Sequence, residues 1–330
     1  MRSVMSQILG VRHIVGWIAG LLVPLGVLAQ PNYPARPVTV VVTMAPGGTT
    51  DIVGRLVAQK LQERMGGSFV VENRPGAGGN IGAAAVAKSA PDGYTLMVQL
   101  SSTQVINPAL YKSTGFDPIK DFAPISPLVK VPYALIVNPK SDVQSVAALI
   151  AKAKASGSKP MQYASAGNGT PNHLLSELMA TMAGVSFAHI PYKGAAPATQ
   201  AVAAGEVPFA FVALPTTIGQ IKSGLVRAIG VSSSEPLAAL PDVPPIARTV
   251  QRFSGDAWVG LFAPAGTPSA IVDRLNAEVR QILASAEVRE RLGASGATPF
   301  VLSSGEFLQL IQTELPIWAD VVRRSGATVD

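Results

Sequence analysis

The sequence predicts an α/β protein built from two lobes, each with a largely parallel sheet covered by helices. Strand-like apolar runs alternate with helical repeats between residues 38 and 100, and the same alternation restarts near residue 131. In each of these two stretches, a glycine-rich turn joins the end of a strand to the start of a helix. A chain of 330 residues also approaches the size at which a single hydrophobic core stops growing, which favours two lobes.

The composition excludes several classes of protein. Hydrophobic residues make up 48% of the chain, enough for an ordered core, so general disorder is excluded. The absence of cysteine excludes disulfides, thiolate metal sites, iron–sulfur clusters and cysteine nucleophiles. The net charge is +6, but Lys and Arg form no runs and aromatic residues are only 6%, which argues against nucleic acid as a partner.

Residues 1–29 are predicted to form a secretory signal peptide. Arg2 and Arg12 supply positive charge, the stretch Ile14–Leu28 is apolar, and cleavage is expected after Ala29. A membrane anchor is the alternative, but about 15 apolar residues interrupted by Pro24 are few for a span. Cleavage would leave 330 − 29 = 301 residues and remove two arginines, which lowers the net charge from +6 to +4.

The first stretch of alternating elements begins with Val38–Thr43, whose β-branched run predicts a buried strand. A helix is expected after the glycine-rich turn that follows, because apolar residues recur at helical spacing from Ile52 to Met65. The pair Gly66-Gly67 should end this helix. A second strand, a helix of small residues and a third strand are expected at Ser68–Glu72, Ile81–Ser89 and Tyr94–Leu100.

The second stretch repeats the pattern and is followed by a change of composition. Its expected elements are, in order, the strand Val131–Val137, the helix Val143–Ala155, the strand Met161–Ser165, a helix marked by Leu174 to Met182, and strands at Ser186–Ile190, Val207–Leu214 and Val226–Val231. The segment Ser232–Gly255 is rich in proline and serine and poorly periodic, which suits a connection back between lobes.

Two further helix starts are predicted near the C-terminus. Thr267 followed by Pro268 is typical of an N-cap with proline in the first helical position. Ser303 with Glu306 three residues later fits a capping box. Trp318 and the apolar residues around it predict a C-terminal helix that docks on a core.

The two glycine-rich turns, Ala45–Asp51 and Ala166–His173, are candidate anion sites. The first N–H groups of a helix lack backbone partners, the helix dipole adds positive charge, and glycine allows close approach. Such a turn binds an anion without arginine or lysine. The N–H donors expected in the two turns are those of Gly47, Gly48, Thr49, Gly167, Gly169 and Thr170. Both turns could equally be plain connections between a strand and a helix.

Other motifs argue against nucleotide binding and catalysis. The first turn lacks the lysine of a phosphate-binding loop, and no G-x-S-x-G or H-E-x-x-H motif occurs. We expect His189 to be structural and His173 to bond either a ligand or the loop backbone. Asp51 and Arg55 should pair across one helical turn. No cofactor or metal site is predicted.

Several motifs occur in an order that is specific to one family. They are Tyr33-Pro34 with Arg36-Pro37, Pro46–Asp51, Glu72–Gly82, Pro91–Leu96, Asn107–Tyr111, Gly167–Thr170 with His173-Leu174, Pro191–Gly194, Leu240–Pro244 and Pro264–Pro268. On this set the chain resembles the Bug (Bordetella uptake gene) receptors, the periplasmic solute-binding components associated with tripartite tricarboxylate transporters. The resemblance covers nearly the whole chain after the signal peptide.

The resemblance implies a two-lobed periplasmic binding protein fold, or flytrap, with a mixed, mostly parallel sheet in each lobe and the ligand cleft between the lobes. Lobe 1 would comprise residues 30–130 plus 255–330, and lobe 2 residues 131–254. A pincer of the two glycine-rich turns would hold a ligand carboxylate. The ligand-binding residues implied in this way are Ala45, Gly47, Gly48, Thr49, Asp51, Ser102, Ala166, Gly167, Gly169, Thr170 and His173.

The implied function is that of a non-catalytic periplasmic receptor. It would capture a small organic carboxylate for uptake through the membrane permease subunits of such a transporter. One departure from the family bears on the ligand, because Pro208 and Val212 replace two frequent acids and Ala213 a frequent amide. If an acid there would pair with a ligand ammonium group, its loss argues against an amino-acid ligand.

Three other functions stay open on the sequence. The chain could be a carboxylate sensor that feeds a two-component system, because capture of the ligand would be the same in both cases. It could be a secreted hydrolase or lyase, although an evident pair of nucleophile and base is lacking. It could also be an anion-binding structural protein that recognises no particular solute.

Overall fold

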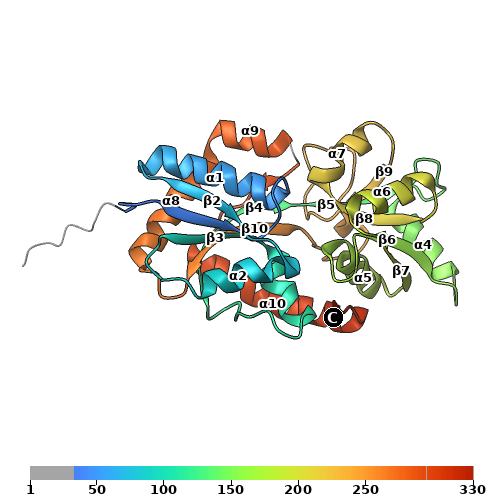
Figure 1. Cartoon of the computed structure of the whole chain (residues 1–330). Coiled ribbons are helices and arrows are strands. Elements are labelled where there is room, and N and C mark those ends of the chain that lie inside the picture. Colours follow the sequence, from blue (N-terminus) through green and yellow to red (C-terminus); the bar gives the residue numbers. More distant parts are fainter. Residues whose placement is uncertain (1–32, 295, 330) are drawn as a thin grey trace, which may run out of the picture. The chain divides into compact units, whose positions relative to one another are not determined.

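The computed structural model describes residues 33–294 and 296–329, so the predicted signal peptide lies outside the described residues. In this part of the chain the strands form two sheets, one of six strands and one of five, with helices against them (Figure 1). We call the six-stranded sheet with its helices lobe 1, and the five-stranded sheet with its helices lobe 2.

The sheet of lobe 1 is mixed. From edge to edge its strands are β11 (Thr298–Pro299), β4 (Phe122–Val131), β10 (Ala257–Pro264), β3 (Thr95–Leu100), β1 (Val38–Val42) and β2 (Phe69–Asn73). The strand β1 pairs in parallel with β2 and with β3, whereas β10 runs antiparallel to both of its neighbours. The carboxyl ends of β1 and β3 therefore meet at one edge of the sheet.

The sheet of lobe 2 is also mixed. Its strands, from edge to edge, are β7 (Phe187–Pro191), β6 (Met161–Ser165), β8 (Phe209–Ala213), β5 (Tyr133–Val137) and β9 (Arg227–Val231). The strand β6 is parallel to β7 and β8, and β5 is antiparallel to β8 and β9. The pairing of Tyr133 with Ala213 places the start of β5 beside the end of β8.

The helices alternate with the strands as the sequence pattern predicts. Those of lobe 1 are α1 (Thr49–Met65), α2 (Asn80–Ala87), α3 (Asn107–Leu110), α8 (Ser269–Ala284), α9 (Ala286–Ala294) and α10 (Ser304–Ser325), with a short 3-10 turn η1 (Ala77–Gly79) and a π-helical turn η2 (Ser102–Ile106). Those of lobe 2 are α4 (Val146–Ala155), α5 (Pro171–Ala183), α6 (Ala195–Ala204) and α7 (Leu214–Lys222). A 3-10 turn, η3 (Ile246–Arg248), lies in the return connection.

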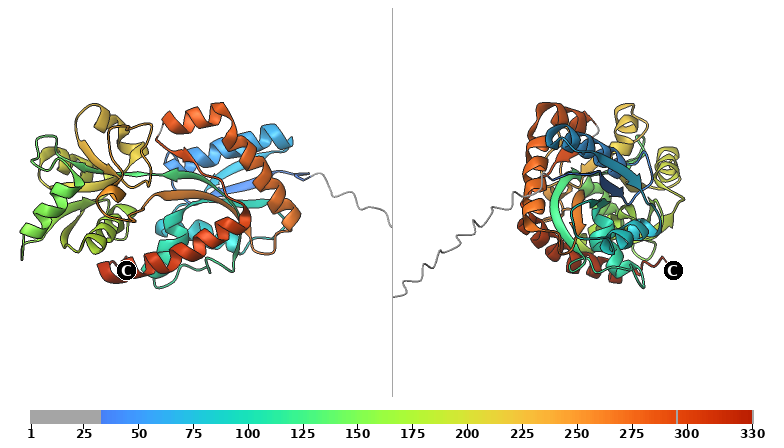
Figure 2. Two further views of the ribbon diagram at one scale, coloured as in Figure 1. Left: turned by 180° about the vertical axis from the view of Figure 1, so that it is seen from behind. Right: turned by 60° about the vertical axis from the view of Figure 1, so that its left-hand side comes forward.

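The chain passes between the two sheets twice, as the green and orange ribbons in Figure 2 show. The outward passage is short, because only Pro132 separates β4 from β5. The return passage runs from the end of β9 to the start of β10. Ser232 ties the two passages together: the Tyr133 N–H donates to its Oγ at 2.8 Å, and this hydroxyl donates to the Asp256 carboxylate. These bonds fix the position of Tyr133.

The core explains why these residues form these elements. The β-branched run of β1 is almost fully buried, since only its second residue reaches partial exposure. Glycine ends α1, because Gly66 takes the left-handed conformation with φ 71°. The helix α10 packs against β4 and also against α5 of lobe 2. Its Phe307 meets Trp258 of β10 edge-to-face, with ring centroids 5.0 Å apart.

One local expectation is wrong. Thr267 does not cap α8, because its hydroxyl donates to the Pro264 carbonyl and the helix begins at Ser269 after Pro268. Ile52 lies in α1 as expected, where its side chain is 51% exposed in the first turn. The capping box at Ser303 and Glu306 is confirmed. The helix docked at the C-terminus is confirmed too, although Trp318 is only partly buried.

Over the described ranges, every helix is too short or too polar to span the apolar thickness of a membrane.

Replacing Ser303 with alanine should lower the free energy of unfolding by about 1 kcal/mol, because the first turn of α10 loses its capping hydroxyl. Urea unfolding followed by circular dichroism measures this. Thr313→Ala is the control, since this exposed hydroxyl bonds only the Gln309 carbonyl within the same helix. It should leave stability unchanged or slightly higher, because alanine favours helix. Equal losses in both variants would contradict the capping role.

Candidate functional site

The first glycine-rich turn opens on a cavity of about 410 Å³. Its walls come from this turn and the start of α1, from the end of β3, from the passage between the sheets, and from the end of β8. The lining residues are Met44, Ala45, Pro46, Gly48, Thr49, Thr50, Leu100, Val131, Tyr133 and Ala213. Both lobes therefore contribute to one cavity, and none of the described side chains that line it is charged.

Asp51 organises the first turn. This residue is 4% exposed, and its carboxylate accepts the Gly47 N–H at 2.9 Å, the Asn73 Nδ2 at 2.8 Å and the Arg55 Nε at about 3 Å. The Asn73 amide also donates to the Met44 carbonyl at 3.1 Å. The predicted pair of Asp51 and Arg55 is confirmed. The carboxylate of Asp51 is thus occupied within the turn rather than presented to the cavity.

The charge of Asp51 is balanced by these contacts. Burial alone would raise the pKa of Asp51, but hydrogen bonds from Arg55, Gly47 and Asn73 hold the pKa below its ordinary value. The carboxylate is therefore ionised, and Arg55 neutralises it. With these two charges balanced, the positive end of the α1 dipole is the charge that the turn presents to the cavity.

Three backbone N–H groups at the start of α1 are free to bind an anion. Within the described residues, the N–H groups of Gly48, Thr49 and Thr50 donate to no acceptor, and the ladder of α1 begins with Ile52 donating to the Gly48 carbonyl. The Gly47 N–H donates to Asp51 in this structure, so the role of Gly47 as a ligand contact stays a prediction. Gly48, Thr49 and Thr50 all line the cavity.

The cavity also has residues that sequence reasoning missed. Leu100 ends β3 and Val131 ends β4, so the parallel strand ends could have suggested them. Tyr133 carried no signal, because its place depends on the passage between the sheets. It is 4% exposed, and its hydroxyl has no hydrogen-bond partner among residues 33–294 and 296–329.

The second glycine-rich turn bonds mostly to itself. The Gly167 N–H donates to the Ser165 Oγ at 3.0 Å, the Gly169 N–H to the His173 Nδ1 at 3.0 Å, and the Thr170 N–H to the Gly167 carbonyl at 3.4 Å. These three N–H groups were the donors expected for an anion; here they bond within the turn, and their role as ligand contacts stays a prediction. Thr170 caps α5 as predicted. In the described structure Ala166 and Asn168 keep free N–H groups.

The second turn meets lobe 1 at Gly169. A methyl group at this position would lie 2.3 Å from a Leu110 side-chain carbon, and φ is +69°. Only glycine fits here without movement of α3. The residues that line the cavity at the first turn include none from the second turn. The pincer of two turns therefore stays a prediction.

The stacked imidazoles of His173 and His189 lie beside the second turn. The rings of His173 and His189 lie 3.9 Å apart and 6° from parallel, and the His189 Nε2 lies 2.6 Å from the Ser165 Oγ. His173 thus bonds the loop backbone, one of its two expected roles, and His189 is structural as predicted. Burial, with a smaller contribution from His189, lowers the pKa of His173 to about 4, and burial lowers the pKa of His189.

The hydroxyls after β3 have separate roles. The Ser101 Oγ accepts the Trp258 N–H at 3.2 Å, and the Thr103 Oγ1 donates to the Gly78 carbonyl at 2.8 Å. Ser102 begins η2, is 8% exposed and makes no hydrogen bond through its hydroxyl with the described part of the chain. It does not line the cavity, so its role as a ligand contact stays a prediction.

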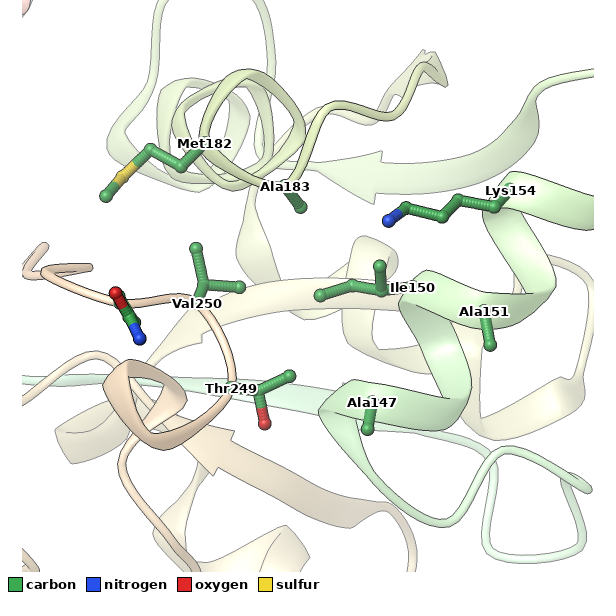
Figure 3. Close-up of a pocket in the computed structure, with 9 residues that line it drawn as sticks. Ala147, Ile150, Ala151, Lys154, Met182, Ala183, Thr249 and Val250 are labelled. Atoms are coloured by element: carbon green, nitrogen blue, oxygen red, sulfur yellow. The ribbon is translucent and has the colours of Figure 1, made fainter.

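Figure 3 shows a second hollow of about 460 Å³, between α4, α5 and the segment after η3. Its walls are mainly apolar side chains such as Ile150, Met182 and Val250, with Lys154 extending its amine from α4. It contains none of the predicted site residues. Among the residues described, no group of three or more His, Cys, Asp or Glu side chains is placed to hold a metal ion.

Comparison with known proteins identifies the family. The TctC family, described as the tripartite tricarboxylate transporter family receptor, matches residues 53–327. The chain belongs to this family. The protein BugT of Bordetella pertussis is 37% identical over 98% of both chains. The resemblance drawn from the ordered motifs is therefore confirmed.

Solved structures of similar receptors share the fold. MatC from Rhodopseudomonas palustris, solved with bound malate, is 34% identical and aligns with a TM-score of 0.72 over 88% of this chain and 100% of that one. An R. palustris protein solved with adipate is 35% identical and aligns with a TM-score of 0.77 over 90% of this chain and 99% of that one. The predicted α/β periplasmic binding protein fold is confirmed.

The variant His173→Asn should flatten the dependence of stability on pH. Asparagine keeps an acceptor for the Gly169 N–H but does not titrate. The unfolded chain takes up a proton near pH 6.5, whereas folded His173 resists it until about 4, so its stabilisation is present above pH 6.5 and is lost as the pH falls to 4. The difference between these two pKa values corresponds to about 3 kcal/mol in the free energy of unfolding.

Urea unfolding at pH 7.5 and pH 4.5 tests this prediction. The free energy of unfolding of the wild type should fall by about 2–3 kcal/mol more than that of the variant between the two pH values. All other titrating groups are present in both proteins. The difference between the two losses therefore isolates the contribution of His173. Parallel losses in the two proteins would show that His173 is not held neutral by the fold.

Proposed function

We propose that this chain is a periplasmic receptor that captures a small organic carboxylate between its lobes and passes it to the membrane permease subunits of a tripartite tricarboxylate transporter. The observation that carries the proposal is the set of free N–H groups at Gly48, Thr49 and Thr50, which opens on a cavity with walls from both lobes. Membership of the receptor family and the malate and adipate in two relatives support it.

The proposed binding residues are those of both turns. The first turn would bind the carboxylate directly through its amides, and the second turn would close on the same group with the N–H groups of Ala166 and Asn168. Lobe 1 would comprise residues 30–130 plus 255–330 and lobe 2 residues 131–254. A signal peptide at residues 1–29, removed on export, would deliver the chain to the periplasm.

The energies show what the first turn can contribute. Three charge-assisted hydrogen bonds contribute roughly 1.5–3 kcal/mol each, or about 5–9 kcal/mol together. Association costs at least about 4 kcal/mol, and micromolar affinity needs about 8 kcal/mol net. The amides alone fall short of this value. The rest of the ligand must therefore gain binding energy from the cavity walls.

We further propose that the chain does not catalyse a reaction. The ten residues that line the cavity include no His, Asp, Glu or Lys that could serve as a general acid or base. The histidine nearest to either turn, His173, uses its Nδ1 to hold the Gly169 N–H. The carboxylate of Asp51 is likewise occupied.

Mass spectrometry of the purified chain under native conditions, followed by a thermal-shift screen of carboxylates, tests the receptor function. We expect a copurifying acid, or a rise in melting temperature with a carboxylate that is recovered unchanged. Conversion of the bound acid to a product would instead indicate an enzyme. Failure of every carboxylate to raise the melting temperature would contradict the proposal.

The variant Gly48→Leu should weaken carboxylate binding at least tenfold while the fold stays intact. Gly48 has φ −77°, and a methyl group there would meet only the Ala45 carbonyl at 3.6 Å, so the larger side chain is tolerated but covers the free amides. Isothermal titration with the acid found above measures the affinity.

Gly219→Leu is the matched control for Gly48→Leu. It is an exposed glycine of α7 with open space around it and no positive φ, so binding should be unchanged. A substitution at Gly169 would be less informative, because its clash with Leu110 disturbs the fold itself. Unchanged affinity in Gly48→Leu would exclude the first turn as the anion site.

A further inference from the structure

We propose that the preferred ligand is a monocarboxylate with an apolar body, and that Tyr133 is a ligand contact. This inference rests on the proposed function, because it names the class of carboxylate held at that same site. Two independent features of the cavity carry it. Its described walls provide a single place for a negative charge, and the hydroxyl of Tyr133, a lining residue that is 4% exposed, has no partner among the described residues.

The walls away from the amides are apolar. Met44, Leu100, Val131 and Ala213 present hydrocarbon or thioether surface, and Pro46 extends that surface along the turn. Leu100 and Ala213 are partly exposed, so their side chains are reachable from the cavity. Apolar surface of this kind gains free energy when it covers a hydrocarbon chain or ring, in proportion to the area removed from water.

A second carboxylate would find no partner there. No Arg, Lys or His is among the described residues that line the cavity, and Arg55 of α1 is already paired with Asp51 and donates to Asn73 at 2.8 Å. In the second turn three N–H groups are bonded internally, and neither Ala166 nor Asn168 lines the cavity. A charge buried without a partner strongly disfavours binding.

Tyr133 supplies the second feature. The residue is 4% exposed, lines the cavity, and its hydroxyl makes no hydrogen bond with the described residues. Burial, with a smaller effect of the Asp256 charge, raises the pKa of Tyr133 above its ordinary value, so the hydroxyl keeps its proton. Buried tyrosine hydroxyls usually have a partner. A ligand oxygen is the partner that this position offers.

Isothermal titration of the purified full chain with matched acids tests the ligand class. Hexanoate is compared with adipate and benzoate with terephthalate, so that each pair differs mainly by one carboxylate. We expect at least one monoacid to bind at least tenfold more tightly than its diacid, and 1-hexanol, which lacks the carboxylate, not to bind. Tighter binding of hexanoate indicates an aliphatic body, and tighter binding of benzoate an aromatic one.

Two variants test the apolar wall and the tyrosine hydroxyl separately. Ala213→Lys places a cation in the apolar wall and should raise adipate affinity at least tenfold relative to hexanoate. Ala238→Lys adds the same charge at an exposed residue outside the cavity and should leave the ratio of the adipate and hexanoate affinities unchanged.

Tyr133→Phe tests the tyrosine hydroxyl and should weaken binding of the better monoacid about tenfold. Its control, Tyr94→Phe, removes a hydroxyl at the opposite end of β3 and should have no effect on affinity.

The outcomes separate this inference from the proposed function. If both diacids bind as tightly as their monoacids, the inference is overturned, while the receptor function stands. Unchanged affinity in Tyr133→Phe, with a melting temperature like that of the wild type, overturns the role of the tyrosine. If none of the four acids binds, the inference fails, and the copurification and thermal-shift results decide whether carboxylate capture fails with it.

Discussion

The buried carboxylate of Asp51 is the interaction on which the site depends. By accepting hydrogen bonds from Gly47, Asn73 and Arg55, it fixes the path of the chain between β1 and α1. This leaves the next three N–H groups without partners at the positive end of a 17-residue helix. Because Arg55 cancels its charge, Asp51 would shape the proposed anion site without repelling the anion.

The two turns look alike in sequence but differ in what they keep free. In the first turn the Asp51 side chain accepts one backbone N–H group, and the next three N–H groups have no partner among the described residues. In the second turn the Ser165 hydroxyl, the His173 ring and the Gly167 carbonyl each take one N–H group, and His189 stacks on His173. The difference arises because the Asp51 carboxylate accepts only one backbone N–H and uses its other acceptor positions for Asn73 and Arg55, whereas the three N–H groups of the second turn have three separate acceptors.

Specificity and capture are separate properties of this cavity. In the proposed site, the free N–H groups would bind a negative group of any kind, since they respond only to charge and geometry. The apolar walls, which come from strand ends and from the passage between the sheets, would select the remainder of the ligand. A change of residue at those strand ends would therefore alter the preferred acid without altering the proposed anion contact at the start of α1.

The sequence by itself determined the alternation of strands and helices, the positions of both glycine-rich turns and the family, because periodicity, glycine and ordered motifs are local signals. Only the tertiary structure decided which amides remain free. The bonds of Gly167 to Ser165 and of Gly169 to His173 are local, but His189 reaches the Ser165 hydroxyl and Asn73 reaches the Asp51 carboxylate from other strands. It alone placed Tyr133 and Val131 on the cavity, because that depends on where the chain crosses between two sheets and leaves no periodic trace in the sequence.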